Sequence, residues 1–125
     1  MTTREHRYYD AVRRNLTRDL LHKNYRDRPE NKYYGHCLHA SIVLMILLGG
    51  KNAGYHLWRG QDDSGDHSWL RSPSGYIIDP TAEQYYNFSK TPPYNSNPRK
   101  IGYRMSKTIK RLLDATLKTL DKEPK

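Results

Sequence analysis

An apolar run near the middle of the chain constrains the fold more than any other feature. Residues 38–48 are almost all apolar and suited to a helix. The run is too short to span a bilayer and too evenly apolar to face water on any side. Gly35 precedes it and Gly49 and Gly50 follow it, so helix breakers stand at both ends. The sequence therefore predicts a buried central helix.

The only cysteine, Cys37, stands at the start of this run. In the first turn of a helix, unpaired backbone N–H groups and the positive end of the dipole favour a thiolate, the reactive form of cysteine. Cysteine is also one of the most commonly buried residues, so core packing explains the same position. From its position alone, Cys37 is either a nucleophile or a residue of the packed core.

Length and composition set broader limits. A chain of 125 residues supports one hydrophobic core, and we expect a single domain over residues 1–125. Phe occurs once and Tyr 11 times, so tyrosines whose hydroxyls reach water or a partner must complete the core. No apolar stretch follows Met1 and the internal run is short, which favours a cytoplasmic protein without a membrane span. A single cysteine excludes an internal disulfide.

The net charge of +9 is concentrated at the two ends of the chain. Residues 1–32 carry nine Lys and Arg against five acids, and residues 99–125 carry nine against three. Residues 33–98, which include Cys37, carry four against five and have no bias towards phosphate. The charge therefore allows an acidic partner to bind through the basic ends. It allows nucleic acid as well, which we do not favour.

Both ends of the chain have the pattern of an amphipathic helix. Between residues 3 and 22, apolar or aromatic side chains recur every three or four positions, at Tyr9, Val12, Leu16 and Leu20. Near the C-terminus, Ser106 is a suitable cap for a helix. Its apolar stripe is predicted to comprise Ile109, Leu112, Leu113, Thr116, Leu117 and Leu120.

After Gly50 the sequence takes on the alternation of strands. Three short strands are predicted, at residues 55–59, 67–71 and 76–79, with turns at 61–66 and 71–75. Pro80 cannot donate to a ladder and should end the last strand. Thr81 is then expected to cap one or two helical turns at 81–88, and a loop rich in Pro and Asn should follow at 91–98.

These elements define the predicted fold class. It is α+β, with a central Cys-bearing helix packed on a small antiparallel sheet and with amphipathic N- and C-terminal helices. Three residue types that acyl-transfer enzymes need occur in this framework, in the order Cys37, His67, Asp79. Cysteine attacks a carbonyl, histidine moves the proton and a carboxylate orients the imidazole.

The turn at 71–75 should bring two of these residues together. It places His67 and Asp79 on neighbouring antiparallel strands, within a residue or two of opposite positions, which permits a hydrogen bond. Taken singly, His67 also fits a surface position on a strand, and Asp79 fits a strand-ending turn before Pro80. The order and spacing of the three residues favour a shared site.

The same residues resemble the core of the transglutaminase-like and papain-like cysteine enzymes. The likeness rests on Cys37 opening an apolar helix, His67-Ser68-Trp69 on a strand, and Ile78-Asp79-Pro80-Thr81 closing the next strand. Small bacterial proteins of the YunG-like type are more similar still. Their pattern of Gly-Gln-Cys, an apolar helix ending in Gly-Gly, His-x-Trp and Ile-Asp resembles Gly35-His36-Cys37, Gly49-Gly50, His67-Ser68-Trp69 and Ile78-Asp79. The resemblance covers residues 35–85 and is weaker in the last helix.

The resemblance implies a papain-like or transglutaminase-like core and a catalytic triad. Cys37 would be the nucleophile, His67 the general base and acid, and Asp79 the group that orients His67. The chain departs from the pattern at His36, where the pattern has Gln. An imidazole can also donate a hydrogen bond, so His36 is a candidate for an oxyanion hole beside the Cys37 backbone N–H.

The predicted function is cysteine-dependent acyl transfer, by hydrolysis, deamidation or cross-linking, on a peptide, isopeptide or glutamine carboxamide of a protein or peptide substrate. It requires no cofactor. Trp58 and Trp69 are candidates for the walls of a substrate groove, although strand tryptophans are more often core residues. A metal site made of His36, Cys37, His39 and His67 is not favoured, because no Cys-x-x-Cys or His-x-x-x-His companion occurs.

The alternative class is a non-enzymatic basic protein. It would bind nucleic acid or an acidic protein partner through the two terminal helices. Basic outer faces are also normal for amphipathic helices of water-exposed domains, so the charge by itself does not decide between the two classes.

Overall fold

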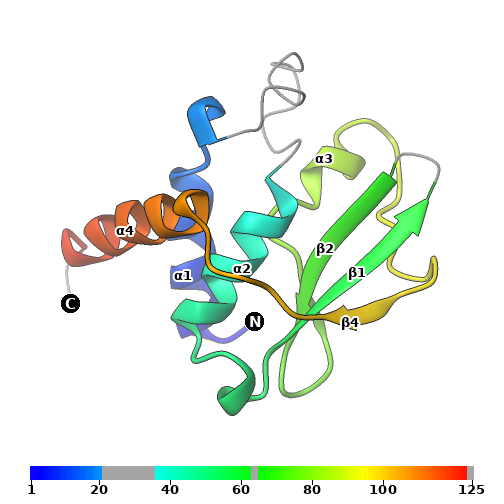
Figure 1. Cartoon of the computed structure of the whole chain (residues 1–125), viewed down its shortest axis with the longest axis horizontal. Coiled ribbons are helices and arrows are strands. Elements are labelled where there is room, and N and C mark those ends of the chain that lie inside the picture. Colours follow the sequence, from blue (N-terminus) through cyan, green and yellow to red (C-terminus); the bar gives the residue numbers. More distant parts are fainter. Residues whose placement is uncertain (21–35, 63–64, 124–125) are drawn as a thin grey trace.

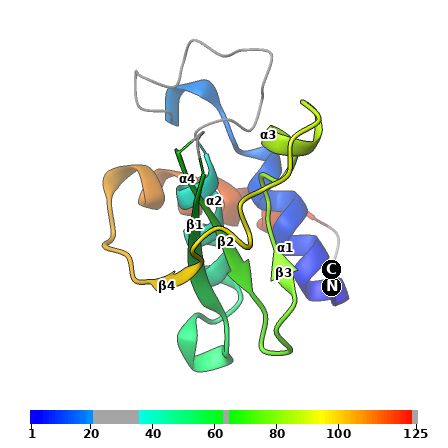
Figure 2. The ribbon, with the colours of Figure 1, turned by 90° about the vertical axis from the view of Figure 1, so that its right-hand side faces the viewer.

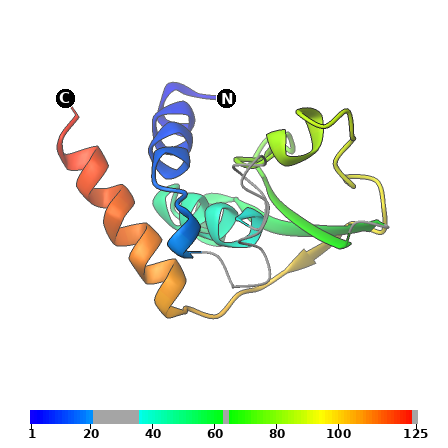
Figure 3. The same cartoon turned by 90° about the horizontal axis from the view of Figure 1, so that it is seen from above.

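The central helix separates a small sheet from the two terminal helices (Figures 1 and 3). The structure, a computed structural model, describes residues 1–20, 36–62 and 65–123. In chain order its elements are α1 (Thr3–Arg14), a 3-10 turn (Arg18–Leu20), α2 (Cys37–Leu47), a 3-10 turn (Lys51–Ala53), β1 (His56–Asp62), β2 (Gly65–Arg71), β3 (Ile77–Ile78), α3 (Glu83–Tyr86), β4 (Arg99–Ile101) and α4 (Lys107–Asp121). The predicted α+β class is confirmed.

Helix α2 is the buried helix that the apolar run predicts. Cys37 is its first residue, and the residues from Ala40 to Met45 are buried. The helix ends where Gly49 and Gly50 adopt φ angles of 101° and 70°, which favour glycine. The Gly50 N–H donates to the Met45 carbonyl at 2.9 Å and satisfies an acceptor at the helix end. Among the described residues, no helix combines the length and the apolar character needed to cross a membrane.

The sheet is antiparallel, with strand order β3-β2-β1-β4. Leu57 of β1 pairs with Leu70 of β2, and Leu70 pairs with Ile78 of β3. All three are buried in the core that includes α2. Because side chains alternate across a strand, His67 and Trp69 of β2 belong to the opposite face of the sheet.

Helices α1 and α4 pack on each other and on α2, and ion pairs reinforce the packing. Glu123, which follows α4, pairs with Arg7 at 2.9 Å and with Arg14 at 2.6 Å. Arg111 pairs with Asp19 at 2.5 Å. Part of the basic charge of the two ends is therefore paired with acids of the same chain. Ser106 caps α4 as predicted, since its hydroxyl accepts from the Ile109 N–H.

The first helix is shorter than predicted. It ends at Arg14 because the Asn15 side chain donates to the Ala11 carbonyl at 2.8 Å and to the Thr119 hydroxyl at 2.9 Å, which favours a cap over continuation. Leu16 and Leu20 are buried all the same. The end of the prediction, at residues 21 and 22, lies outside the described residues.

The predicted strands are also revised. Strand β1 continues through Gly60, which the sequence suggested as its boundary, so the turn is shorter than residues 61–66. A Cβ added to Gly60 would lie 2.0 Å from the Pro93 carbonyl oxygen, so this glycine permits a close backbone approach rather than a turn. Strand β4 was not predicted, because it is three residues long and mostly charged.

Two side-chain predictions are wrong. Leu117 does not complete the apolar stripe of α4, because its side chain is 42% exposed. Thr81 does not cap α3; the N-cap is Ala82, which makes no side-chain capping bond. The Thr81 hydroxyl lies instead 3.5 Å from Asp79 Oδ1. That contact competes with capping and places Thr81 in the site described below.

A buried carboxylate ties the start of α1 to the sheet. Glu5 is only 2% exposed. Its Oε1 accepts from the Thr2 N–H at 2.7 Å and from the Tyr76 hydroxyl, and its Oε2 accepts from the Tyr55 hydroxyl at 2.7 Å. Burial acts to raise the pKa of Glu5, but the hydrogen bonds from Tyr76, Tyr55 and Thr2 outweigh it and lower the pKa to about 2.

Glu5→Gln is expected to lower the free energy of unfolding at pH 7 by about 1 to 3 kcal/mol, because an amide cannot accept from donors on both sides. The pKa of Glu5 is lowered by folding, so its contribution is present above about pH 4.5 and is lost as the pH falls through about 2. In urea titrations, the difference in free energy of unfolding between wild type and Glu5→Gln should therefore shrink as the pH falls towards 2.

Glu123→Gln is the matched control. Glu123 forms ion pairs with the exposed side chains of Arg7 and Arg14, and solvated pairs contribute little. The same substitution should therefore destabilise the protein much less at Glu123 than at Glu5. Equal losses at the two positions would contradict the role of the buried carboxylate.

Candidate active site

The register of β2 and β3 brings His67 and Asp79 into direct contact. Leu70 pairs with Ile78, so Asp79 follows the last strand residue and turns towards the start of β2. Nε2 of His67 lies 2.6 Å from Oδ2 of Asp79. The two side chains are 0% and 3% exposed, so this is a buried charge-assisted hydrogen bond. The hydrogen bond that the sequence permitted is present.

Asp79 accepts several further hydrogen bonds from the described residues. The Thr81 N–H donates to Oδ1 at 3.1 Å, and the Tyr94 hydroxyl donates to Oδ2 at 2.7 Å. The Tyr9 hydroxyl, from α1, donates to the Asp79 backbone carbonyl at 3.3 Å. Donors at both oxygens suit a carboxylate better than an amide, whose NH2 group would face another donor.

The His67 ring lies among aromatic side chains. Trp69 stacks on it at a centroid distance of 5.9 Å, and Tyr85 of α3 meets it edge-on at 4.8 Å. Burial acts to lower the pKa of His67, but the hydrogen bond to Asp79 and the neighbouring Cys37 raise it to about 9. The imidazole is therefore protonated at neutral pH.

Cys37 approaches this ring from the first turn of α2. It is a free, half-buried thiol, and its proximity acts to raise the pKa of His67. Nε2 is occupied by Asp79, so Nδ1 is the nitrogen that remains for the thiol. Nδ1 has no hydrogen bond of ordinary geometry to any described residue. Cys37 is therefore a neighbour of the ring that forms no such hydrogen bond with it.

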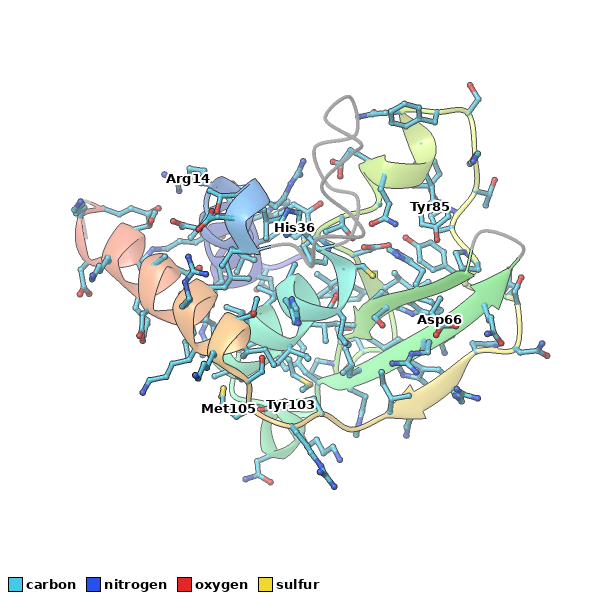
Figure 4. All side chains as sticks on the ribbon, turned by 45° about the horizontal axis from the view of Figure 1, so that its top comes forward. Arg14, His36, Asp66, Tyr85, Tyr103 and Met105 are labelled. Atoms are coloured by element: carbon cyan, nitrogen blue, oxygen red, sulfur yellow. The ribbon has the colours of Figure 1, made fainter. Side chains whose placement is uncertain are left out.

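The fold explains how α2 reaches a residue on the far face of the sheet. Strand β3 pairs only with Leu70 and Arg71, so the start of β2 is not covered by β3. The Ser41 hydroxyl, one turn after Cys37, donates to the Ser68 carbonyl at 3.3 Å and fixes α2 beside β2. In Figure 1 the start of α2, the start of β2 and α3 lie towards the same end of the molecule, and Figure 4 marks this end with His36 and Tyr85.

The other candidate residues have different environments. His36 is the N-cap of α2, and it is buried and makes no side-chain capping bond. Burial and the neighbouring His39 lower its pKa to about 4, although Asp19 acts to raise it, so its imidazole is neutral at pH 7. Trp69 is completely buried, packed against His67 and Tyr94, and it cannot meet a substrate in this arrangement. Trp58 is half-buried.

Trp58 lies on the same face of the sheet as Trp69, its partner in the β1–β2 register. The Arg71 guanidinium lies 4.2 Å from the centroid of its ring. Lys100 Nζ of β4 lies 6.0 Å from it. Of the two tryptophans, only Trp58 retains exposed surface for a groove wall.

Sequence reasoning missed Tyr94, Tyr9, Tyr85 and Thr81 as members of the site. Three of them are tyrosines, and the excess of tyrosine over phenylalanine was the available signal. Composition could not say which tyrosines meet Asp79 and His67. Within residues 1–20, 36–62 and 65–123, no three His, Cys, Asp or Glu side chains gather closely enough to hold a metal ion.

Comparisons of the chain with protein-family models, with curated proteins and with solved structures find no match.

The His67–Asp79 pair should give stability a defined pH dependence. The pKa of His67 is raised by folding from 6.5 to about 9, so its contribution is fully present below about pH 6.5 and is lost as the pH rises through about 9. The free energy of unfolding, measured in urea between pH 6 and 10, should fall in wild type by on the order of 1 to 3 kcal/mol more than in His67→Gln. Parallel curves for the two proteins would show that the pair is not charged in the folded state.

Proposed function

We propose that this protein is a cysteine-dependent acyl-transfer enzyme with a papain-like or transglutaminase-like core. Cys37 is the nucleophile, His67 the general acid and base, and Asp79 the residue that orients His67. The observation that supports this most is the buried bond of 2.6 Å between His67 Nε2 and Asp79 Oδ2, which leaves Nδ1 for the half-buried thiol.

The reaction proceeds in two steps. The Cys37 sulfur attacks as the thiolate of a thiolate–imidazolium pair on the carbonyl carbon of a peptide, isopeptide or glutamine carboxamide, and the His67 imidazolium gives its Nδ1 proton to the departing amine or ammonia. The carbon–nitrogen bond breaks and an acyl-thioester forms. Neutral His67 then takes a proton from water or from an acceptor amine as that group attacks the thioester. Hydrolysis releases an acid, transfer releases an amide, and both restore the imidazolium and the sulfur nucleophile.

The surroundings of His67 suit this role. Asp79 fixes the tautomer and orientation of the ring through Nε2, and stacking on Trp69 limits its rotation. The imidazolium, protonated at neutral pH, supplies the proton that the leaving amine needs. The Cys37 backbone N–H, in the first turn of α2, is the first candidate for an oxyanion donor, and the buried His36 imidazole is the second.

The experiment that tests this function measures Cys37-dependent turnover of amide substrates. The purified chain is incubated with a peptide library containing glutamine carboxamides and lysine isopeptides, with and without a fluorescent primary amine. Release of ammonia or amine is expected, and Cys37→Ala should reduce it by at least about 100-fold. Turnover that survives Cys37→Ala would contradict the proposal. Steeply salt-dependent DNA binding by a chain without turnover would favour the basic binding protein.

Alkylation of Cys37 tests the pairing without a substrate. At pH 6.5, His67→Gln should slow the reaction of Cys37 with iodoacetamide by at least about tenfold, because the cation that stabilises the thiolate is lost. The rate is measured by intact-protein mass spectrometry.

His39→Gln is the matched control for the alkylation experiment. His39 is also on α2 and half-buried, and burial lowers its pKa below the ordinary value, which disfavours a positive charge on this ring. This variant should react like wild type. Equal rates for wild type and His67→Gln would separate Cys37 from His67 and return Cys37 to the role of a packing residue.

A further inference from the structure

The loop of residues 91–98 is docked on the face of the sheet that bears His67. Figure 2 shows this loop, in yellow, crossing in front of the strands on the side away from α2. Pro92 and Pro93 are buried in it, and the Gln61 N–H of β1 donates to the Ser96 carbonyl at 3.0 Å. Gly60 has no side chain at the point where Pro93 approaches. The loop is therefore held to β1 by its backbone and by its prolines.

Docking of this loop carries Tyr94 into the site. Its hydroxyl donates to Asp79 Oδ2 at 2.7 Å, the same oxygen that His67 Nε2 contacts at 2.6 Å. Its ring meets Trp69 edge-on at 5.0 Å and lies 6.4 Å from the His67 ring. Tyr94 thus touches the carboxylate and both rings of the stack.

The shared oxygen gives Tyr94 a chemical effect on His67. A hydroxyl that donates to Oδ2 takes up part of the negative charge of that oxygen and weakens its hold on the proton of His67. Burial, together with Asp79, raises the pKa of Tyr94 far above its ordinary value, so the hydroxyl remains a donor throughout the neutral range.

We propose that Tyr94 is a positioning residue for the His67–Asp79 pair, held in place by the contact between Gly60 and Pro93. The proposal rests on the proposed function for its catalytic meaning, because Tyr94 acts through Asp79 and His67. It fixes which carboxylate oxygen faces Nε2, and it tunes how readily His67 gives up its proton.

Tyr94→Phe leaves the other titratable residues around the pair unchanged in identity. Among the described residues they come from α2, α1 and α3 and include Cys37, Tyr9 and Tyr85, with Tyr86 acting on Tyr94. Behind them, Arg13 donates to the Tyr9 hydroxyl and pairs with Glu83. Tyr94→Phe therefore removes one hydrogen bond and no charge.

The test follows the titration of the His67 ring by NMR in the full chain, between pH 6 and 11. In Tyr94→Phe the midpoint of His67 is expected to move upward by about 0.5 to 1 pH unit, as loss of one hydrogen bond to the carboxylate leaves Asp79 a stronger partner for the imidazolium. Tyr103→Phe is the control, because Tyr103 is exposed and Figure 4 shows it far from Tyr85. A midpoint that is the same in Tyr94→Phe and wild type overturns the proposal.

A second variant tests how Tyr94 is held. In Gly60→Ala the new Cβ would lie 2.0 Å from the Pro93 carbonyl oxygen and 2.8 Å from Trp69, so the loop must move. This variant should shift the His67 midpoint in the same direction as Tyr94→Phe. The double variant should shift the His67 midpoint little more than either single variant, because both substitutions act on the same contact between Tyr94 and Asp79.

Gly102→Ala is the matched control for the glycine. A Cβ at Gly102 meets no heavy atom within 4 Å, so the midpoint should stay at the wild-type value. Additive shifts in the Gly60→Ala, Tyr94→Phe double variant would show that the Gly60 contact does not act through Tyr94, and they overturn that part of the proposal.

The NMR readout separates this inference from the proposed function. A shifted midpoint in a chain whose Cys37 shows no turnover supports the role of Tyr94 towards the pair and counts against the enzyme. Cys37-dependent turnover with an unshifted midpoint supports the enzyme and overturns the role of Tyr94. Where turnover is present, Tyr94→Phe is expected to lower kcat with little change in KM, because the hydroxyl acts on proton transfer and not on substrate binding.

Discussion

The hydrogen bond between His67 and Asp79 is the interaction on which the rest of the site depends. Both side chains are almost completely buried, and burying ionisable groups costs several kcal/mol unless each is paired and hydrogen-bonded. Hydrogen-bond donors placed around the pair offset this cost. Thr81, in the turn after β3, and Tyr94, in the loop after α3, supply donors to the carboxylate, and Tyr9 of α1 supplies a donor to its backbone. The pair and its donors thus come from four separate parts of the chain.

Tyrosine hydroxyls serve the same purpose at two places in the molecule. Tyr55 and Tyr76 donate to the buried carboxylate of Glu5, and Tyr94 donates to that of Asp79. A phenylalanine would fill the same volume but would leave each carboxylate short of a donor. Three of the 11 tyrosines thus donate to buried carboxylates, a role beyond the completion of the core that the sequence predicted.

The parts of the fold that follow from local sequence were predicted well. The apolar run, with Gly49 and Gly50 after it, defines α2 and places Cys37 in its first turn. The turn before Tyr76 sets the register that joins His67 to Asp79. The parts that depend on contacts distant in sequence were missed. Gly60 looked like a strand boundary because nothing in its neighbourhood shows that Pro93 approaches it.

Contacts between residues distant in sequence also explain the other differences between the predicted and the observed fold. Residues 99–101 lack the alternation typical of a strand, and they form β4 only because β1 offers an open edge. Leu117 fits the spacing of the apolar stripe, but no partner covers it in the described structure, where it is 42% exposed. Spacing along a helix defines a face, whereas the elements that cover the face decide which residues are buried.

The central claim is that Cys37 and His67 act together, and a crystal structure of the reduced protein tests it most directly. The decisive quantity is the distance between Cys37 Sγ and His67 Nδ1. We expect it to be within about 4 Å, the reach of a thiol and an imidazole before substrate binding, with Nε2 still bound to Asp79. A distance beyond about 6 Å, with the sulfur turned into the apolar core and the His67–Asp79 bond intact, would contradict the account.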